Sequence, residues 1–424
     1  MCHVADVERS HDQLAAIQRR TLRVLFATQI ISGVGISIGA SVGALLAADI
    51  AGVGASGLAT STAVIGAALF AIPATAIVHH RGRRPSLTAA YLVAALGAIL
   101  VVIAAARGIV PLMFAGFFLF GGASAAGLQA RYAALDLAPD AQRGRHLSVI
   151  VWATTIGAIA GPNLAAVAGA SLDNLAIPTL AGPFAFSAVL LTLAAITLTL
   201  FMRPDPAVVA RTAAATSTTA PQARTTFRDA LRNVAALPDA RLGMAAVAVG
   251  HLVMVGVMTM TPVHVRSAGH EAAHTLRIVG VVISVHIAGM YAFSPVIGWL
   301  TDRVGRRPVI LTGIALLITA CAVSALAGHN HTQLGVGLTL LGLGWSCTMI
   351  AGSTLLSESV AIDQRASVQG LSDLTMGLAG ATAGALSGVV VYAWGFAMLG
   401  LIAALATVPF LALALRSRRS TVDG

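Results

Sequence analysis

The chain has 424 residues, of which 57% are hydrophobic and only 10% are charged, and its formal net charge is +10. Soluble globular proteins carry about 25% charged residues, so this composition excludes a protein surrounded only by water and indicates one embedded in a bilayer. All basic residues are arginines at the ends of apolar segments. They lack the interleaved aromatic side chains of a nucleic-acid-binding surface, and we expect no nucleic-acid partner.

The apolar segments, taken in chain order, are long enough to cross a bilayer, which requires about 20 residues each. We therefore predict an all-α integral membrane protein with twelve spans joined by short loops. A cytoplasmic segment, 1–20, precedes the spans, and a cytoplasmic tail, 416–424, follows them. The predicted spans lie near residues 24–48, 56–78, 86–106, 110–134, 147–169, 180–202, 242–265, 277–299, 309–328, 332–356, 366–390 and 395–415.

One long cytoplasmic loop, 203–241, divides the predicted spans into two bundles of six, over 21–202 and 242–415. The middle of this loop is rich in alanine, threonine and serine, which is typical of a flexible connection. Its last part, 227–237, contains both apolar and charged residues and is predicted to form a surface helix.

The arginines are distributed unevenly between the two sets of loops. If the N-terminus is cytoplasmic, about 23 arginines lie on the cytoplasmic side, and about 3 (Arg107, Arg266 and Arg277) lie on the other. Cytoplasmic loops of membrane proteins carry such an excess of basic residues. We therefore expect both termini inside, an even number of spans, and a multi-pass protein of the cytoplasmic membrane.

A basic, glycine-containing loop occurs once in each half of the chain. The copy at 298–308 reads GWLTDRVGRRP, and a degenerate copy at 81–85 reads RGRRP. Asp136 and Arg143 in the first half match Glu358 and Arg365 in the second, seven residues apart in both cases. The sequence therefore predicts a duplicated architecture, which is typical of secondary transporters.

At these residues the chain resembles the major facilitator superfamily, whose signature loop between spans two and three is often repeated between spans eight and nine. The first copy departs from the signature, with Thr75 in place of a glycine and His79 and His80 in place of Asp-Arg. The resemblance implies two pseudo-symmetric six-helix bundles that give alternating access to a central cavity. The second copy matches the signature at Gly298, Asp302, Arg303, Gly305, Arg306 and Arg307.

The predicted fifth span also resembles part of a motif found in proton-coupled drug antiporters, at Gly157, Gly161 and Pro162. The match is partial, since Ser148 stands where an earlier glycine is expected and alanines occupy 165–166. Small residues at this spacing also allow ordinary close packing of membrane helices, and that interpretation stays open.

The resemblance implies that the basic loops form a cytoplasmic gate. Asp302 is expected to pair with Arg303 or Arg306 and to face the N-terminus of the fifth span, where an anion is favoured. In the alternative interpretation, the arginines only determine topology and bind anionic lipid. The remaining gate candidates are Gly298, Gly305, Arg307, Arg83, Arg84, Asp136, Arg143, Glu358 and Arg365.

The first loop copy lacks an acidic residue, because His79 and His80 occupy that place. Unperturbed histidines titrate near pH 6.5, and a neutral histidine does not replace a carboxylate at a helix N-terminus. Three interpretations stay open: a weak gate contact, a contact that responds to pH, and a motif that has simply degenerated.

Four ionisable residues are predicted inside spans, where lipid makes them costly and a function is the default explanation. Asp373 is a candidate proton carrier, or else makes a structural hydrogen bond. His286 and His251 bind protons or substrate, or else form hydrogen bonds between helices. Arg131 binds an anionic substrate, pairs with Asp373, or extends to the membrane interface.

The family resemblance also implies that spans one, four, seven and ten line the cavity. Methionines there suit varied apolar ligands, although they are equally common as ordinary helix packing. A dense set of polar groups that grips a sugar is missing from these segments, which favours an amphiphilic substrate. The cavity candidates are Gln29, Ser32, Gln129, Met254, Met258 and Trp345.

We therefore predict a monomeric secondary active transporter that exports small amphiphilic molecules in exchange for protons. Its expected partners are a small-molecule substrate, protons and the bilayer. The sequence contains no GxxxxGK[ST] motif and no paired-cysteine motif, so we expect neither ATP, nor another cofactor, nor a metal. Two alternatives remain: an importer or facilitator of a small metabolite or organic anion, and a non-transporting polytopic receptor or enzyme.

Overall fold

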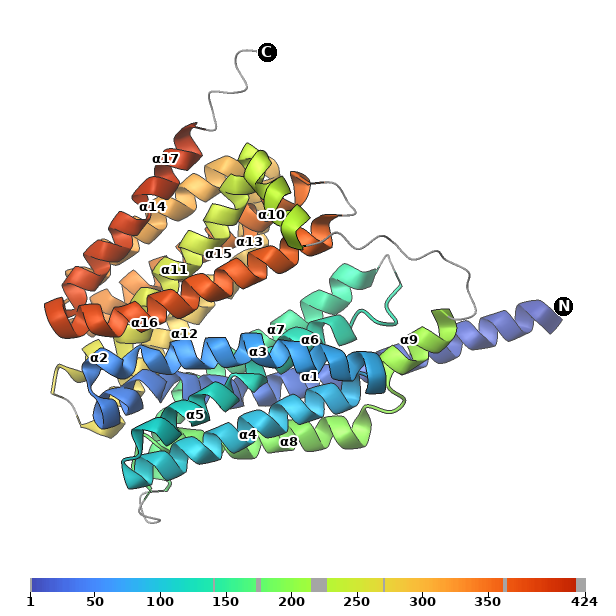
Figure 1. Ribbon diagram of the computed structural model, residues 1–424, viewed down its shortest axis with the longest axis horizontal. Helices are drawn as coiled ribbons and strands as arrows, with labels where there is room; N and C mark the ends of the chain where they lie inside the picture. Colours follow the sequence, from blue (N-terminus) through green and yellow to red (C-terminus); the bar gives the residue numbers. More distant parts are fainter. Residues whose placement is uncertain are drawn as a thin grey trace. The chain divides into compact units, whose positions relative to one another are not determined.

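The computed structural model describes residues 2–139, 142–172, 177–214, 227–269, 271–360 and 364–416. These residues are almost entirely α-helical, and none of them forms a strand (Figure 1). The predicted all-α class is confirmed. The helices pack into two units, which comprise residues 1–40 with 65–220 and residues 41–64 with 221–424.

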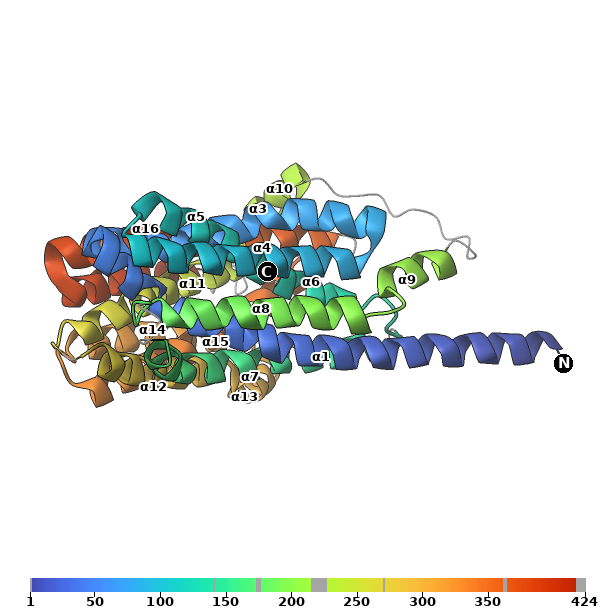
Figure 2. The same ribbon diagram turned by 90° about the horizontal axis from the view of Figure 1, so that it is seen from below.

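In the first unit, α4 lies at the centre and packs against α5, α6 and α8. The two views place α4 beside α8 (Figures 1 and 2). The α1 helix begins in this unit and ends in the second, whereas α3 begins in the second unit and ends in the first. The helices are α1 (Cys2–Ala51), α3 (Leu58–Arg81), α4 (Arg83–Arg107), α5 (Val110–Phe120), α6 (Gly122–Ala133), α7 (Arg143–Ala170), α8 (Gly182–Phe201) and α9 (Pro206–Ala214).

In the second unit, α15 packs against α11, α12 and α14, and α16 packs against α11 and the short helix α2. The predicted surface helix at 227–237 is confirmed as α10, whereas α9 was not predicted. The helices are α2 (Val53–Ser56), α10 (Phe227–Ala236), α11 (Pro238–Arg266), α12 (Ala272–Tyr291), α13 (Ser294–Val304), α14 (Arg306–Ala325), α15 (His331–Glu358), α16 (Arg365–Ala406) and α17 (Val408–Arg416).

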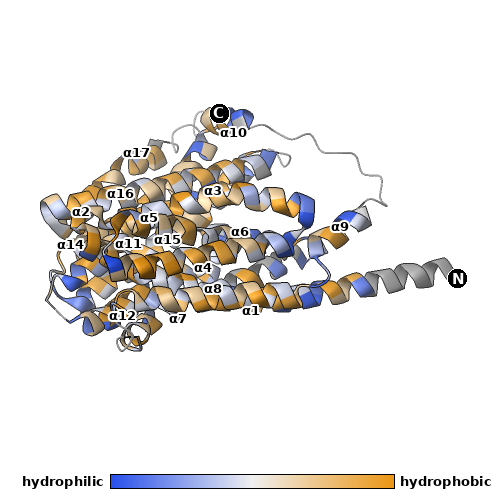
Figure 3. Ribbon diagram, turned by 60° about the horizontal axis from the view of Figure 1, so that its bottom comes forward, coloured by the Kyte–Doolittle hydropathy of each residue, from blue (hydrophilic) through white to orange (hydrophobic). Residues whose placement is uncertain are grey.

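The outer faces of these helices are apolar, as expected for helices surrounded by lipid. Large hydrophobic side chains such as Ile72, Val189 and Leu386 are exposed rather than buried. Figure 3 shows apolar residues along most of the helices. Between helices, small residues bring backbones together: a Cβ atom at Gly97 would lie 2.6 Å from the Gly116 carbonyl oxygen. Such close approach is typical of helix packing in membranes.

Eleven segments in the described part of the chain are long and apolar enough to cross a membrane, one fewer than predicted. The difference arises at the end of the chain, where a single segment, Ser367–Leu415, includes the two spans predicted at 366–390 and 395–415. Within it, Gly395 leaves the helical conformation, with φ 82° and ψ 172°. The predicted eighth span is also interrupted, since α12 ends at Tyr291 and α13 begins at Ser294.

Candidate functional site

The two basic loops fold into the same tight turn in both units. Gly82 separates α3 from α4 with φ 100°, and Gly305 separates α13 from α14 with φ 100°. Glycine adopts this left-handed region readily, whereas a residue with a Cβ atom is strained there. The turn places Arg83 and Arg306 at the first position of the helix that follows.

These two arginines make equivalent ion pairs. Arg83 donates to Asp136 through Nε (2.9 Å) and Nη2 (3.0 Å), and Arg306 donates to Glu358 through Nε (2.9 Å) and Nη2 (2.7 Å). Both pairs are bidentate, the geometry in which a guanidinium binds a carboxylate most strongly. The structure therefore brings together, in each half, an arginine of the loop and the acid that the sequence comparison matched.

The pair in the first half is the more enclosed of the two. The side chains of Arg83 and Asp136 are 14% and 15% exposed, compared with 26% and 48% for Arg306 and Glu358. Arg83 also donates from Nη1 to Gln129 Oε1 (2.6 Å), and Gln129 Nε2 donates to Thr75 Oγ1 (3.0 Å). Gln129, predicted to line a cavity, therefore lies within the arginine cluster.

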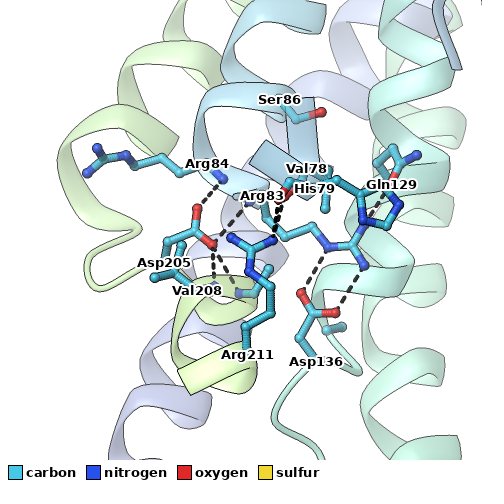
Figure 4. A network of polar contacts seen from close by, with 12 residues as sticks. Val78, His79, Arg83, Arg84, Ser86, Gln129, Asp136, Asp205, Val208 and Arg211 are labelled. Carbon is cyan, nitrogen blue, oxygen red and sulfur yellow. Dashed lines mark hydrogen bonds and ion pairs between the residues drawn. The ribbon is translucent and has the colours of Figure 1, made fainter. Parts of the chain in front are cut away.

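Asp205 supplies the carboxylate that the first loop lacks (Figure 4). It accepts hydrogen bonds from the backbone N–H groups of Arg83 (3.1 Å) and Arg84 (2.7 Å), at the N-terminus of α4. An anion is stabilised at a helix N-terminus, where backbone N–H groups lack partners. Asp205 belongs to the central loop and therefore lies outside the motif. Within the motif, His79 and His80 stand where the signature has Asp-Arg.

The same segment also binds the end of the preceding helix. Arg211 of α9 donates from Nη1 to the carbonyl oxygens of Val78 (2.8 Å) and His79 (3.0 Å), at the C-terminus of α3 (Figure 4). A cation is favoured there by the helix dipole. Sequence analysis missed Asp205 and Arg211, although Asp205 directly precedes Pro206, which is a common start of a helix.

In the second half the motif keeps its own acid. Asp302 is 76% exposed, and its Oδ1 lies 3.3 Å from Arg306 Nη2. Arg307 pairs with Asp239 at 2.5 Å, a partner that sequence analysis did not identify. Arg303 lies over the Trp299 ring, 5.1 Å from its centroid.

Two further gate candidates, Gly298 and Arg365, make no such contacts with the residues that the structure describes. A Cβ atom at Gly298 would meet nothing within 4 Å, and Arg365 is exposed at the start of α16. The side chain of Arg143 lies outside the part of the chain that the structure describes.

A chain of buried hydrogen bonds crosses the first unit. Tyr91 of α4 donates from its hydroxyl to Gln29 Oε1 (2.9 Å) and shares a hydrogen bond with the hydroxyl of Ser32 (3.0 Å). Gln29 Nε2 then donates to Thr154 Oγ1 of α7 (3.1 Å). The two predicted cavity residues of α1 are thus joined to α4 and α7. Tyr91, which completes this network, was not predicted.

In the second unit, an aromatic and histidine cluster joins three helices. Trp345 Nε1 of α15 donates to His251 Nδ1 of α11 (3.2 Å), and Tyr291 of α12 lies edge-on to the Trp345 ring, with centroids 5.8 Å apart. An indole N–H only donates, so His251 Nδ1 must be the acceptor, and a neutral ring carries its proton on Nε2. Two residues predicted separately, His251 and Trp345, therefore form one unit with Tyr291.

The remaining candidates lie in different surroundings. His286 is completely buried and donates from Nδ1 to the Leu338 carbonyl oxygen (2.8 Å), which joins α12 to α15. Its Nε2 and the Nε atom of Arg131 are buried without a partner among the described residues. Asp373 is exposed on α16. Met254 is buried and Met258 is half-buried, both on α11.

The glycines of the fifth span serve close packing against α1. A Cβ atom at Gly157 would lie 2.7 Å from the Ile30 carbonyl oxygen, and one at Gly161 would lie 2.7 Å from the Ser37 Cβ atom. Pro162 lies within the same helix, α7. The structure thus gives these glycines a packing contact and neither supports nor opposes the antiporter interpretation.

The helical fold, the duplicated turn and the matched ion pairs define a duplicated helical membrane protein. The family profile described as Major Facilitator Superfamily matches residues 25–276 and 267–423. The chain therefore belongs to the major facilitator superfamily, and it is a transporter-family protein rather than an enzyme.

Relatives and solved structures agree with this assignment. The MFS-type transporter YdeG of Bacillus subtilis (strain 168) is 37% identical over 396 residues, which cover 93% of this chain and 90% of YdeG. The riboflavin transporter RfnT of Brucella anthropi is 30% identical over 372 residues, which cover 85% and 86% of the two chains. Among solved structures, a bacterial homologue of the human lysosomal transporter Spinster superposes with a TM-score of 0.73 and 16% identity, covering 95% and 97% of the two chains.

Proposed function

We propose that the protein is a secondary active transporter that exports small amphiphilic molecules in exchange for protons, by alternating access. The observation that carries this proposal is the matched pair of bidentate clasps, Arg83–Asp136 and Arg306–Glu358, at equivalent turns of the two halves. A protein with a single static state has no evident need for two equivalent charge clasps. In a transporter whose two halves rock against each other, each half needs an ion pair that keeps the helices at its loop end together.

The proposal includes the topology predicted from the arginines, with twelve spans and both termini in the cytoplasm. The last candidate segment has 49 residues. As one straight helix it would be roughly 74 Å long, whereas the hydrocarbon core is about 30 Å thick. The break at Gly395 supports two spans in this segment, which makes the total even.

The side chains that we expect to meet the substrate come from two sets. In the second unit, the cluster of His251, Tyr291 and Trp345 offers flat apolar rings with few polar atoms, which suits an amphiphilic molecule. In the first unit, Gln29 and Ser32 offer amide and hydroxyl groups held by Tyr91. We propose each set, within its own unit, as a contact for the substrate.

Two groups are proposed to couple transport to protons, and they are Asp373 and His251. Protonation of His251 on Nδ1 would remove the acceptor that now binds Trp345 Nε1. A proton on this ring therefore competes with the indole contact, which links proton binding to the position of an aromatic side chain. Asp373 lies on α16, the helix that also packs against α11. The fully buried His286, which joins α12 to α15, is better suited to packing.

Everted membrane vesicles energised with a proton gradient test this proposal, with ethidium as a lipophilic probe. Wild-type vesicles should accumulate the probe, whereas Asp373→Asn and His251→Gln should lose the response to the gradient. Glu271→Gln serves as the control, because Glu271 is an exposed acid at the start of α12. Full retention of gradient-driven uptake in both variants would exclude this coupling.

An importer remains the second candidate, and the relative that is a riboflavin transporter supports it. The same aromatic cluster would then stack against a flat heterocycle. Counterflow in proteoliposomes separates the candidates. Exchange of radiolabelled riboflavin without a response to the proton gradient favours the importer, whereas gradient-driven ethidium transport without riboflavin exchange favours the exporter.

A further inference from the structure

A groove opens on the side of the second unit, between α12 and α15, with a volume of about 670 Å³. This volume lies within the range of about 300–1,000 Å³ that is typical of pockets for drug-sized molecules. Its lining is mostly aliphatic, and the principal aliphatic side chains are those of Ile278, Val281, Val285, Val336 and Leu340. Val281 and Val336 are largely exposed, so the groove faces outward from the helix pair.

The groove lies next to a close contact between the two helices. At the contact, a Cβ atom at Gly289 would lie 2.7 Å from the Thr339 carbonyl oxygen, and one at Gly342 would lie 2.4 Å from the His286 carbonyl oxygen. Nearer the start of α15, a Cβ atom at Gly335 would meet nothing within 4 Å. The glycine contacts therefore lie beyond the C-terminal end of this wedge-like groove, which extends toward the N-termini of both helices.

One end of the wedge carries the positive charge of Arg277. His331 also lines this end, and none of the lining residues is acidic. Arg277 is exposed and has no carboxylate partner among the described residues, in contrast to Arg266, which pairs with Asp49. Arg277 lies roughly 8 Å along α12 from its first residue, and its long side chain can extend to the level of the headgroups.

The chain direction places this end opposite the charged gate. The α15 helix runs from His331, in the groove, to Glu358, which pairs with Arg306. If the gate is cytoplasmic, as proposed above, the groove lies in the outer leaflet. An apolar wedge that is open to lipid, with an uncompensated cation at headgroup depth, is complementary in charge and shape to an anionic phospholipid.

We propose that this groove binds one anionic phospholipid, with its phosphate at Arg277 and an acyl chain between the two rows of aliphatic side chains. Val281 and Val285 form the row on α12, and Val336 and Leu340 form the row on α15. The phospholipid fills the wedge and steadies α12 against α15 near His286. This inference does not depend on the transported substrate or on proton coupling.

Native mass spectrometry and thermal unfolding of the purified full-length protein in detergent test the proposal. The probes are palmitoyl-oleoyl phosphatidylglycerol and the phosphatidylcholine with the same acyl chains. One basic residue near an anionic lipid supports about a fivefold preference for phosphatidylglycerol. Arg277→Gln should abolish this preference and leave phosphatidylcholine binding unchanged, whereas Arg277→Lys should retain most of it.

Two variants separate the groove from general surface charge. Gly335→Leu should weaken binding of both lipids, because the new side chain enters the open wedge without displacing a neighbour. Arg107→Gln removes another exposed arginine, at the end of α4, and should behave like the wild type. The proposal is overturned if Arg277→Gln keeps the preference, or if Arg107→Gln loses it equally.

Inorganic phosphate and the ethidium assay provide the remaining controls. Phosphate alone, without an acyl chain, should not raise the unfolding temperature. An equal rise with phosphate would identify a simple anion site and refute lipid binding. Loss of ethidium transport in Gly335→Leu with unchanged lipid binding would show that the groove serves the substrate, which also contradicts the proposal.

Discussion

The two clasps offer a quantitative test, because they share a geometry and differ in exposure. The side chains of Arg83 and Asp136 are 14% and 15% exposed, whereas the side chain of Glu358 in the matching pair is 48% exposed. Removing one partner of a buried pair costs about 3–5 kcal/mol, while an exposed pair contributes about 0.2–1 kcal/mol. Because the first pair is not completely buried, Asp136→Asn should lower the free energy of unfolding by about 2–4 kcal/mol. Glu358→Gln should lower it by less than about 1 kcal/mol.

Reversible unfolding in mixed dodecyl maltoside and dodecyl sulfate micelles measures both values. A double-mutant cycle with Arg83→Gln and Asp136→Asn then isolates the pair from the separate hydrogen bond between Arg83 and Gln129. Equal losses of unfolding free energy in Asp136→Asn and Glu358→Gln would refute the argument that burial makes the first ion pair contribute more than the second. A coupling energy near zero in the cycle would refute the Arg83–Asp136 contact itself.

The remaining predictions concern the turns, the borrowed acid and the aromatic cluster. Gly82→Ala should lower the free energy of unfolding more than Gly305→Ala in the same assay. A Cβ atom at Gly82 would lie 2.4 Å from Asp205 Oδ2, whereas one at Gly305 would meet only the Pro308 ring at 3.8 Å. Equal losses in the two variants would contradict this prediction. Asp205→Ala should lower the free energy of unfolding by about 1–2 kcal/mol through loss of a helix cap, and Asp205→Asn should restore part of it. Trp345→Phe keeps a ring but removes the N–H donor, so the pH profile of ethidium uptake should shift while an Arg107→Gln control stays unchanged; an identical profile would exclude the His251 contact from coupling.

The sequence predicted the parts of this protein that are local along the chain. The apolar segments predicted the helices, and the GRRP stretches predicted the loops that the structure shows as turns at Gly82 and Gly305, where glycine takes a φ of 100° without strain. The seven-residue spacing of Asp136 from Arg143, matched by that of Glu358 from Arg365, indicated a repeat. The structure shows both acids paired with matching arginines. The number of spans remains a prediction, because Gly395 breaks a segment that is apolar throughout.

The parts that were missed depend on contacts between distant segments. Asp205 lies more than a hundred residues from Arg83, and no pattern around it shows which helix it caps. Tyr91 is apolar enough to pass as core, and only the fold shows that its hydroxyl joins Gln29 and Ser32. The groove at Arg277 is likewise not predicted from the sequence, because its lining comes from two helices that are far apart in the chain.

From the divergence of the two loop copies, we infer that they have different mechanical roles. In the first half, the acid at the start of α4 comes from Asp205, which also accepts from the backbone N–H of Ala207 in α9 and so ties α9 to α4. In the second half, Arg306 has two carboxylates within reach, Glu358 at 2.7 Å and the largely exposed Asp302 at 3.3 Å. A guanidinium shared between two acids releases one of them at low cost, because the other still neutralises its charge. We therefore propose that Asp302 exchanges partners when the transporter changes state, whereas Asp205 keeps the turn at Gly82 in place.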